Sequence, residues 1–364
     1  MNQTTFDVSI LAISAHITTV SSSMSLVGGI IIILSYQYIP ATQNQVRAML
    51  VALTVADMLT ALGYEISSLR WYTIGMKNST TSDTFCKAQS FLTTFSSMSS
   101  FFWTTFIALY LFHCVWFSTD LHVSGSQRLW LHCLAWGLPG VITLVALAYG
   151  VLGNNGFALN GVWCWLNKTF ADKYGLHWML LTGKGWEILT YLITASLYIS
   201  LKIRTFLKRG RHNSYLWNQV SNGLRREDEL FCFTWLILYC LRIWGTIRFV
   251  IDIIEDGNHL RNSHVENFKV ALLFLQSYGD SAQAFWNFIL FCVCDNTVRS
   301  FSLDNLIPLS NHKKVSTDSA DIHSNPQENT NTNLQKDNEQ QPLLHSRKLT
   351  HSVAHSQKNL TTSV

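Results

Sequence analysis

Charged residues are scarce in this chain. Asp, Glu, Lys and Arg make up 13% of its 364 residues, whereas soluble proteins contain about 25%. Residues 8–46, 88–119 and 129–167 contain none of these four residue types. Because a membrane-spanning helix needs about 20 predominantly apolar residues, each of these stretches is long enough to span a bilayer. This composition excludes a soluble enzyme, a disulfide-rich secreted module and a disordered chain.

Catalytic and metal-binding motifs are also lacking. The sequence has no His-Glu-x-x-His, no Gly-x-Ser-x-Gly, no Gly-Lys-Ser/Thr loop and no Cys-x-x-Cys, and the spacing of Cys292 and Cys294 does not match the usual zinc pairs. The alternating ten-residue strands of a membrane β-barrel are missing too. We therefore predict that the protein is not an enzyme, holds no cofactor or metal, and does not bind nucleic acid.

Long apolar segments dominate the first 300 residues and predict an all-α membrane protein. The predicted spans cover residues 9–36, 48–71, 87–116, 129–152, 177–201, 230–254 and 268–294. We expect one receptor-sized domain over residues 1–301, folded as a seven-transmembrane helix bundle. Residues 302–364 are rich in Ser, Thr, Asn and Gln and poor in aromatic residues, which predicts a disordered cytoplasmic tail.

The distribution of Lys and Arg predicts the orientation, because cytoplasmic loops are enriched in both. With the N-terminus outside, sixteen of the 26 lie on the cytoplasmic side and seven on the outer side. We therefore expect a multi-pass protein of the plasma membrane. Three glycan acceptor sequences, at Asn2, Asn78 and Asn167, then lie outside and predict a glycoprotein, whereas a fourth at Asn359 lies in the tail.

The cysteines divide between the two sides in the same topology. Of eight cysteines, Cys86 and Cys164 alone lie on the oxidising side, so we predict a disulfide between the top of the third span and the loop that follows the fourth. Cys292 and Cys294 lie at the inner end of span seven. They could carry fatty acyl chains or be inert buried thiols, and the sequence favours neither.

Several charged residues fall inside the predicted spans. A charge at mid-membrane costs about 2.5 to 3.5 kcal/mol on insertion scales, so such residues face the bundle interior or a watery cavity. Counted by depth, the candidates for an outer ligand pocket are Glu65, Lys184 and Arg248. The deeper residues, interpreted as a structural or switching network, are Asp57, Glu187, Arg242 and Asp280. For the outer group, ion pairs that only set helix packing are an equal alternative.

Small residues and basic loops carry two further expectations. Ser21, Ser25 and Gly29 form a small-xxx-small row in span one, which favours packing within the bundle over a dimer contact. The basic loop over residues 202–226 can lie on anionic membrane lipid. Arg225 and Arg226, at the start of span six, are the residues we expect to contact a partner on the cytoplasmic face.

Four longer strings of residues are distinctive: Phe101 to Leu111 in span three, Trp163 to Trp165 in the second outer loop, Trp178 to Glu187 in span five and Leu241 to Val250 in span six. These strings resemble the orphan G-protein-coupled receptor 157 family. The resemblance implies a receptor that passes a signal from an extracellular ligand of unknown identity to a heterotrimeric G protein. It further implies the phosphoinositide and calcium (Gq-type) branch and suggests a ciliary membrane. The rhodopsin-type Asp-Arg-Tyr and Asn-Pro-x-x-Tyr motifs are absent.

Two other functions stay open on the residues alone. A seven-helix transporter or channel could use the buried charges as a proton or solute path, although the sequence lacks the repeated halves common in transporters. An intramembrane hydrolase could use Asp57 and Asp280 as paired carboxylates, although no motif surrounds either residue. We interpret the chain as a receptor that works by a shift between two conformations.

Overall fold

The protein is described by a computed structural model. It describes residues 3–74, 84–117, 123–154, 161–167, 175–209, 236–255, 263–295 and 298–299. The sequence-based predictions for the tail (302–364), for Asn2 and Asn78, and for Arg225 and Arg226 fall outside these residues.

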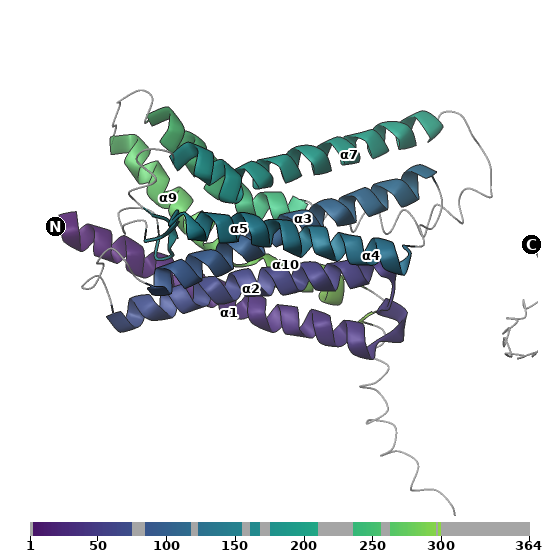
Figure 1. The fold of residues 1–364 in the computed structure, drawn as a ribbon, viewed down its shortest axis with the longest axis horizontal. Coiled ribbons are helices and arrows are strands. Elements are labelled where there is room, and N and C mark those ends of the chain that lie inside the picture. The colour runs from purple at the N-terminus through teal and green to yellow at the C-terminus, as the bar shows by residue number, and fades with distance from the viewer. Residues whose placement is uncertain are drawn as a thin grey trace, which may run out of the picture. The chain divides into compact units, whose positions relative to one another are not determined.

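The first three spans are long helices that lie side by side (Figure 1). They are α1 (Gln3–Tyr38), α2 (Gln45–Ile74) and α3 (Thr84–Phe117). A short 3-10 turn, η1 (Pro40–Thr42), connects α1 to α2. Pro40 starts this turn, because its fixed φ suits the first position, and Thr42 Oγ1 donates a hydrogen bond of 2.8 Å to the Ile39 carbonyl. The connection is therefore short enough to make the two helices antiparallel neighbours.

The fourth span is one helix with a local change of pitch. It consists of α4 (Gly125–His132), the π-helical turn η3 (Cys133–Gly137) and α5 (Leu138–Ala148). Ser124 and Gln127 begin it with a reciprocal capping box, which satisfies backbone N–H groups of the first turn. After α5, strand β1 (Leu152–Gly153) pairs antiparallel with β2 (Trp165–Leu166) in the loop toward the fifth span.

The last three spans are less regular. The fifth is helical over residues 175–179 and continues as the π-helical turn η4 (Leu180–Lys184) and α7 (Gly185–Arg209). The sixth helix covers residues 236–255. The seventh consists of α9 (Ser263–Gly279), α10 (Gln283–Phe288) and the π-helical turn η5 (Ile289–Val293).

The predicted seven-helix bundle is confirmed. Each predicted span is helical over most of its described length, although the fourth helix ends at Ala148 and not at residue 152, and the seventh is interrupted after Gly279. The first six residues predicted for span six lie outside the described part. Among the described residues, four helices are long and apolar enough to cross a membrane: Val8–Tyr38, Gln45–Thr73, Thr84–Cys114 and Gly125–Ala148. The remaining three spans carry most of the buried ionisable side chains.

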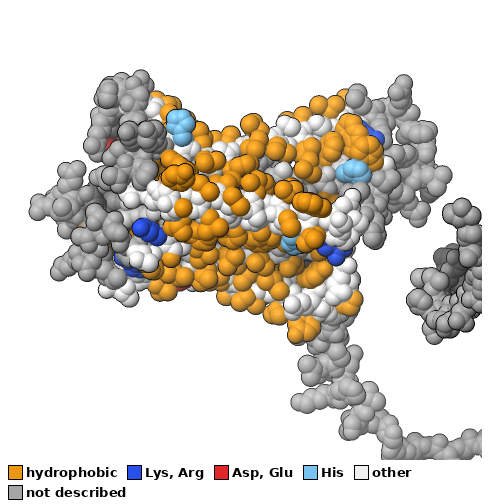
Figure 2. Space-filling view, viewed as in Figure 1, with side chains coloured by type: hydrophobic (Ala, Val, Ile, Leu, Met, Phe, Trp, Pro, Cys, Tyr) orange, Lys and Arg blue, Asp and Glu red, His pale blue; other side chains and the backbone are white. Residues whose placement is uncertain are grey.

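The surface of the bundle is suited to lipid. Hydrophobic side chains cover the middle of the face seen in Figure 2, and Lys and Arg lie toward its two ends. Large apolar residues such as Val141, Leu144 and Leu192 are more than half exposed. An apolar surface of this extent is unfavourable in water but favourable in the hydrocarbon core, which agrees with a multi-pass membrane protein.

Span seven is interrupted where α9 ends, and a side chain of α1 forms hydrogen bonds with the backbone groups at the break. Without a continuous helix, the Ser281 carbonyl and the Phe285 N–H lose their partners within the helix. Ser25 Oγ donates to the Ser281 carbonyl at 2.5 Å and accepts from the Phe285 N–H at 3.3 Å. Ser21 Oγ lies 2.5 Å from Ser281 Oγ. The serines of the small-residue row thus pack within the bundle, as predicted, and Ser25 also replaces the missing backbone bond.

Candidate functional site

Six ionisable side chains meet in the interior of the bundle, and all are buried. They are Asp57 on α2, Lys184 at the end of η4, Glu187 on α7, Arg242 and Arg248 on the sixth helix, and Asp280 at the break in span seven. Three are acidic and three are basic, so their formal charges balance. Balance matters because a buried charge is tolerated only when it is paired or hydrogen-bonded.

Glu187 is the best-supported carboxylate of this network. Its Oε2 accepts from Lys184 Nζ at 2.8 Å, and its Oε1 accepts from the Tyr191 hydroxyl at 2.9 Å and from Thr246 Oγ1 at 2.5 Å. The ion pair with Lys184 spans the junction between the π-helical turn η4 and α7. The Thr246 bond connects the fifth span to the sixth, so Glu187 holds the two helices together.

Asp280 connects α2 with α9 and, through Gln276, with the sixth helix. Its Oδ2 accepts from the Tyr64 hydroxyl at 3.3 Å and from the Gln276 amide at 3.1 Å. Gln276 also accepts from Arg248 Nη1 at 3.0 Å. Asp280 reaches this place because Gly279 lies directly against the sixth helix: a Cβ on Gly279 would come within 1.8 Å of the Leu241 carbonyl oxygen.

Arg242 lies at the centre of the network. Its Nε donates to the Gln283 side-chain oxygen at 2.9 Å, and its guanidinium lies over the Phe101 ring, 4.9 Å from the centroid. The charge lies within electrostatic reach of Asp280, Glu187 and Asp57. Arg242 Nη2 is buried and has no hydrogen-bond partner among the described residues. One donor of the central cation is therefore available for a rearrangement.

Asp57 is bonded by neutral groups. Its Oδ1 accepts from Ser100 Oγ on α3 at 2.6 Å, and its Oδ2 accepts from the Asn287 amide on α10 at 3.1 Å. Asp57 therefore connects three spans without a direct ion pair. Asp57 and Asp280 accept hydrogen bonds from different donors. Their hydrogen bonds therefore do not form the paired carboxylate site that a hydrolase would use.

The structure groups the charged residues differently from their predicted depth. Lys184, predicted to line an outer pocket with Glu65 and Arg248, is paired with Glu187 of the deeper group. Glu65 is half-buried and accepts a hydrogen bond from Ser22 on α1. Arg248 reaches the network through Gln276. One network thus includes Lys184, Arg248 and the deeper residues, whereas Glu65 is bonded at the contact between α1 and α2.

The predicted disulfide is present. Cys86 at the top of α3 is bonded to Cys164 in the loop between β1 and β2, with 5.3 Å between their Cα atoms. Gln89, one turn further along α3, accepts from the Cys164 N–H at 3.0 Å. Asn167, the glycan acceptor sequence that the structure describes, follows β2, and its N–H donates to the Val151 carbonyl at 2.7 Å.

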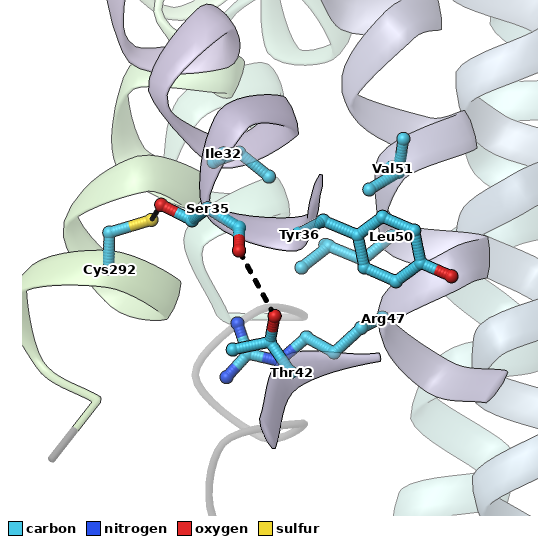
Figure 3. Close-up of a pocket in the computed structure, with 8 residues that line it drawn as sticks. All are labelled: Ile32, Ser35, Tyr36, Thr42, Arg47, Leu50, Val51 and Cys292. Carbon is cyan, nitrogen blue, oxygen red and sulfur yellow. Dashed lines mark hydrogen bonds between the residues drawn. The ribbon is translucent and has the colours of Figure 1, made fainter. Parts of the chain in front are cut away.

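At the opposite end of the bundle, Arg47 on α2 holds the end of span seven. It forms an ion pair with Asp295 and donates to the Phe291 carbonyl at 3.0 Å. Next to it is a small, mainly apolar pocket between the C-terminal end of α1, the N-terminal end of α2 and η5 (Figure 3). Cys292 is buried in its wall with its sulfur 3.7 Å from Ser35 Oγ, whereas Cys294 is exposed. Of the two thiols, Cys294 is therefore the one accessible for acylation.

Sequence reasoning missed the neutral members of the network. They include Tyr64, Tyr191, Thr246, Gln276, Gln283 and Asn287. Three of these are amides inside one predicted membrane span, which is a signal that could have been used, because buried amides need partners. No group of three or more His, Cys, Asp or Glu side chains that could hold a metal ion occurs among the residues that the structure describes.

Known proteins resemble this chain over most of its length. Residues 8–214 match the family described as 7 transmembrane receptor (Secretin family). G-protein coupled receptor 157 of Mus musculus is 30% identical over 79% of this chain and 84% of the relative, and that of Homo sapiens is 31% identical over 79% and 83%. Cyclic AMP receptor-like protein A of Dictyostelium discoideum is 23% identical over 77% of this chain and 64% of its own length.

The position of the family match agrees with the architecture. It covers the first five spans, which carry Asp57, Lys184 and Glu187, and the relatives extend the similarity to about four-fifths of the chain. An identity of about 30% over four-fifths of the chain, with seven helices in the expected order, decides the family. The chain belongs to the G-protein-coupled receptor 157 family of seven-transmembrane receptors.

Proposed function

We propose that this receptor passes a signal from an extracellular ligand to a heterotrimeric G protein. The observation that carries the proposal is the buried network around Arg242. Few direct bonds join its fifth, sixth and seventh spans, and Tyr64 connects α2 to Asp280. Contacts of this kind have alternative partners within reach, so a ligand that favours one pairing shifts the population of helix arrangements by its difference in affinity.

The ligand pocket in this proposal lies between the disulfide-bonded end and the network. Lys184 and Arg248 are the nearest cations to that end, and an acidic group on a ligand would compete with Glu187 or Gln276 for them. Competition at Arg248 would release the sixth helix from the seventh, and competition at Lys184 would free Glu187, the acceptor of the Thr246 bond between the fifth and sixth spans. Glu65, bonded to Ser22, marks the α1 side of the proposed pocket.

The orientation follows from the same proposal. The end with the Cys86–Cys164 disulfide faces the outside, because disulfides persist in oxidising surroundings. The N-terminus is then outside the plasma membrane, with glycans at Asn2, Asn78 and Asn167. Resemblance to the family supports the phosphoinositide and calcium branch and a ciliary membrane as the location.

The G protein docks at the opposite end. Arg225 and Arg226 supply positive charge next to the moving end of span six, and such charge speeds the encounter with an acidic partner. Neutralising both should reduce G-protein activation several-fold at equal surface expression. Neutralising Lys208 and Arg209 at the end of α7 is the matched control and should have a smaller effect.

The test is a panel of G-protein activation assays in cells with and without the receptor, followed by nucleotide exchange on purified G proteins. We expect basal activation of the branch that releases calcium. Charge movement across sealed vesicles is measured in parallel on the same preparation. Charge movement without nucleotide exchange would replace the receptor proposal with a transporter.

A further inference from the structure

The loop segment over residues 161–167 inserts a large side chain into the disulfide-bonded end of the bundle. Trp163 is only 7% exposed. Together with Val162 it packs in a cluster with Ile10 and Leu11 on α1, Tyr64 on α2 and Leu273 on α9. A loop residue thus packs among three membrane helices.

Three bonds hold the segment in this position. Cys164 is tied to Cys86 by the disulfide. The Gln89 side chain accepts from the Cys164 N–H and donates to the Gly63 carbonyl at 3.3 Å, so it joins the segment to α2 and α3. Ser67 Oγ donates to the Val162 carbonyl at 2.6 Å. The backbone on both sides of Trp163 is therefore bonded to the helices.

The backbone before Trp163 is shaped around its ring. Gly161 has a φ of 92°, which side-chain-bearing residues rarely adopt. A Cβ at this position would come within 2.4 Å of the Trp163 ring. The glycine therefore allows the chain to fold back over the indole, and the ring position depends on it.

Trp163 is also connected to the buried network. Its ring meets the Tyr64 ring edge to face, with 5.4 Å between centroids. The Tyr64 hydroxyl donates to Asp280, which lies at the break in span seven. A displacement of the indole therefore changes the packing of the tyrosine that holds Asp280.

We propose that Trp163 is a built-in plug. It occupies the mouth of the bundle, which is the space between α1, α2 and α9 at the disulfide-bonded end, and it favours the inactive arrangement of the network. This inference rests on the proposed function, since it assigns regulation to the same site. The indole is tethered, so its effective concentration at the mouth is high, and a ligand must displace it to reach Asp280. The ligand class that fits is a molecule whose flat apolar group replaces the indole between α1, α2 and α9.

The first test is Trp163→Ala, with indole itself as the probe. Basal G-protein activation per surface receptor should rise about threefold or more, because the variant loses the contact that favours the inactive population. Indole at millimolar concentration should return the activity toward that of the wild type, as apolar cavities bind aromatic molecules of matching shape. Unchanged or lower basal activity at equal surface expression would overturn the proposal.

Trp165→Ala is the matched control. Trp165 lies on the other side of Cys164 and packs in a separate cluster with Ala146, Val151 and Leu152. Loss of the Trp165 side chain should leave basal activity within about twofold of the wild type, and added indole should have no effect on this variant. An equal rise in both variants would show that loosening the loop, rather than emptying the mouth, causes the effect.

A second readout does not depend on signalling. In purified receptor, indole should raise the melting temperature of Trp163→Ala and leave those of the wild type and Trp165→Ala unchanged. If Trp163→Ala does not reach the surface, Trp163→Leu is tested instead. Its side chain is smaller than the indole and still leaves part of the space empty. Absence of G-protein activation in the wild type as well as in every variant would refute the proposed function, whereas absence of the indole effect on melting refutes the plug by itself.

Discussion

Glu187 and Asp57 are equally inaccessible carboxylates in the same network, but they are held differently. Glu187 accepts from a cation, Lys184, and from two hydroxyl groups. Asp57 accepts from one hydroxyl and one amide, both neutral. The first site joins the fifth and sixth spans, and the second joins α2, α3 and α10.

The difference shows that one bundle uses two ways to bury an acid. At Glu187 the charge of the lysine offsets the cost of desolvation, so neither partner can be removed alone without leaving a buried charge. At Asp57 the nearest cation, Arg242, acts at a distance and is bonded to Gln283. We therefore expect Glu187 to determine stability and Asp57 to be more tolerant of change.

The largest effect should come from Glu187→Gln. The substitution leaves Lys184 buried without its counter-charge, which costs about 3 to 5 kcal/mol of unfolding free energy for a broken buried pair. Surface expression should fall steeply, and the melting temperature of purified receptor should fall with it.

A double replacement separates the lost charge balance from the lost contacts. Lys184→Met combined with Glu187→Leu removes both charges, and replacing a buried pair by apolar residues is often neutral. The double variant should recover most of the expression lost in Glu187→Gln. If it is as unstable as the single variant, the hydroxyl bonds to Glu187, rather than the ion pair, hold the two helices.

The ion pair between Lys184 and Glu187 could have been predicted from the sequence, but the estimate of depth in the membrane placed the two residues in different groups. Lys184 and Glu187 are three residues apart, a spacing that makes side chains neighbours on a helix. Counting 1.5 Å per residue from the outer end placed them in different groups. The π-helical turn over Leu180–Lys184 also rotates the side chains before it relative to those of α7. No residue pattern in the sequence predicted this turn.

The surroundings of Asp280 could not be predicted in the same way. Hydropathy identified the span and its buried acid, and the disulfide and the packing of Ser21 and Ser25 followed from position and residue size. The break after Gly279 and the bond from Tyr64 depend on contacts between segments more than 200 residues apart in sequence. Such contacts are set by tertiary packing, which a single sequence does not encode locally.

Ser100→Ala tests how strongly Asp57 depends on its neutral donors. Removing one of the two leaves a buried acceptor half-satisfied, and a bond to a carboxylate is worth about 1.5 to 3 kcal/mol. Thermal unfolding of purified receptor should show a loss in this range. Ser99→Ala is the control, because Ser99 is also buried but donates to the Phe95 carbonyl of its own helix. Equal losses in both variants would mean that cavity formation, not the Asp57 bond, is responsible.

Thr246→Val makes the corresponding change at Glu187 and should cost less. Glu187 keeps Lys184 and Tyr191 as donors, so the expected loss is about 1 kcal/mol, that of an ordinary hydrogen bond. Thr54→Val, where the hydroxyl donates to the Leu50 carbonyl of its own helix, is the matched control. A loss greater than that of Ser100→Ala would reverse the comparison between the two carboxylates.

The smallest change in stability should come from Asp57→Asn. The amide has the shape of the carboxyl group, one oxygen still accepts from Ser100, and Asn287 can rotate its amide to present an oxygen to the new N–H₂ group. The neutral side chain is less costly to bury, which offsets the lost attraction to Arg242, so unfolding free energy should stay within about 1 kcal/mol of the wild type. Basal G-protein activation should change more than stability does, because Arg242 loses one of three carboxylates within its reach. A drop in melting temperature as large as that of Glu187→Gln would show that Asp57 is held by Arg242 as firmly as Glu187 is held by Lys184, and the two sites would then be equivalent.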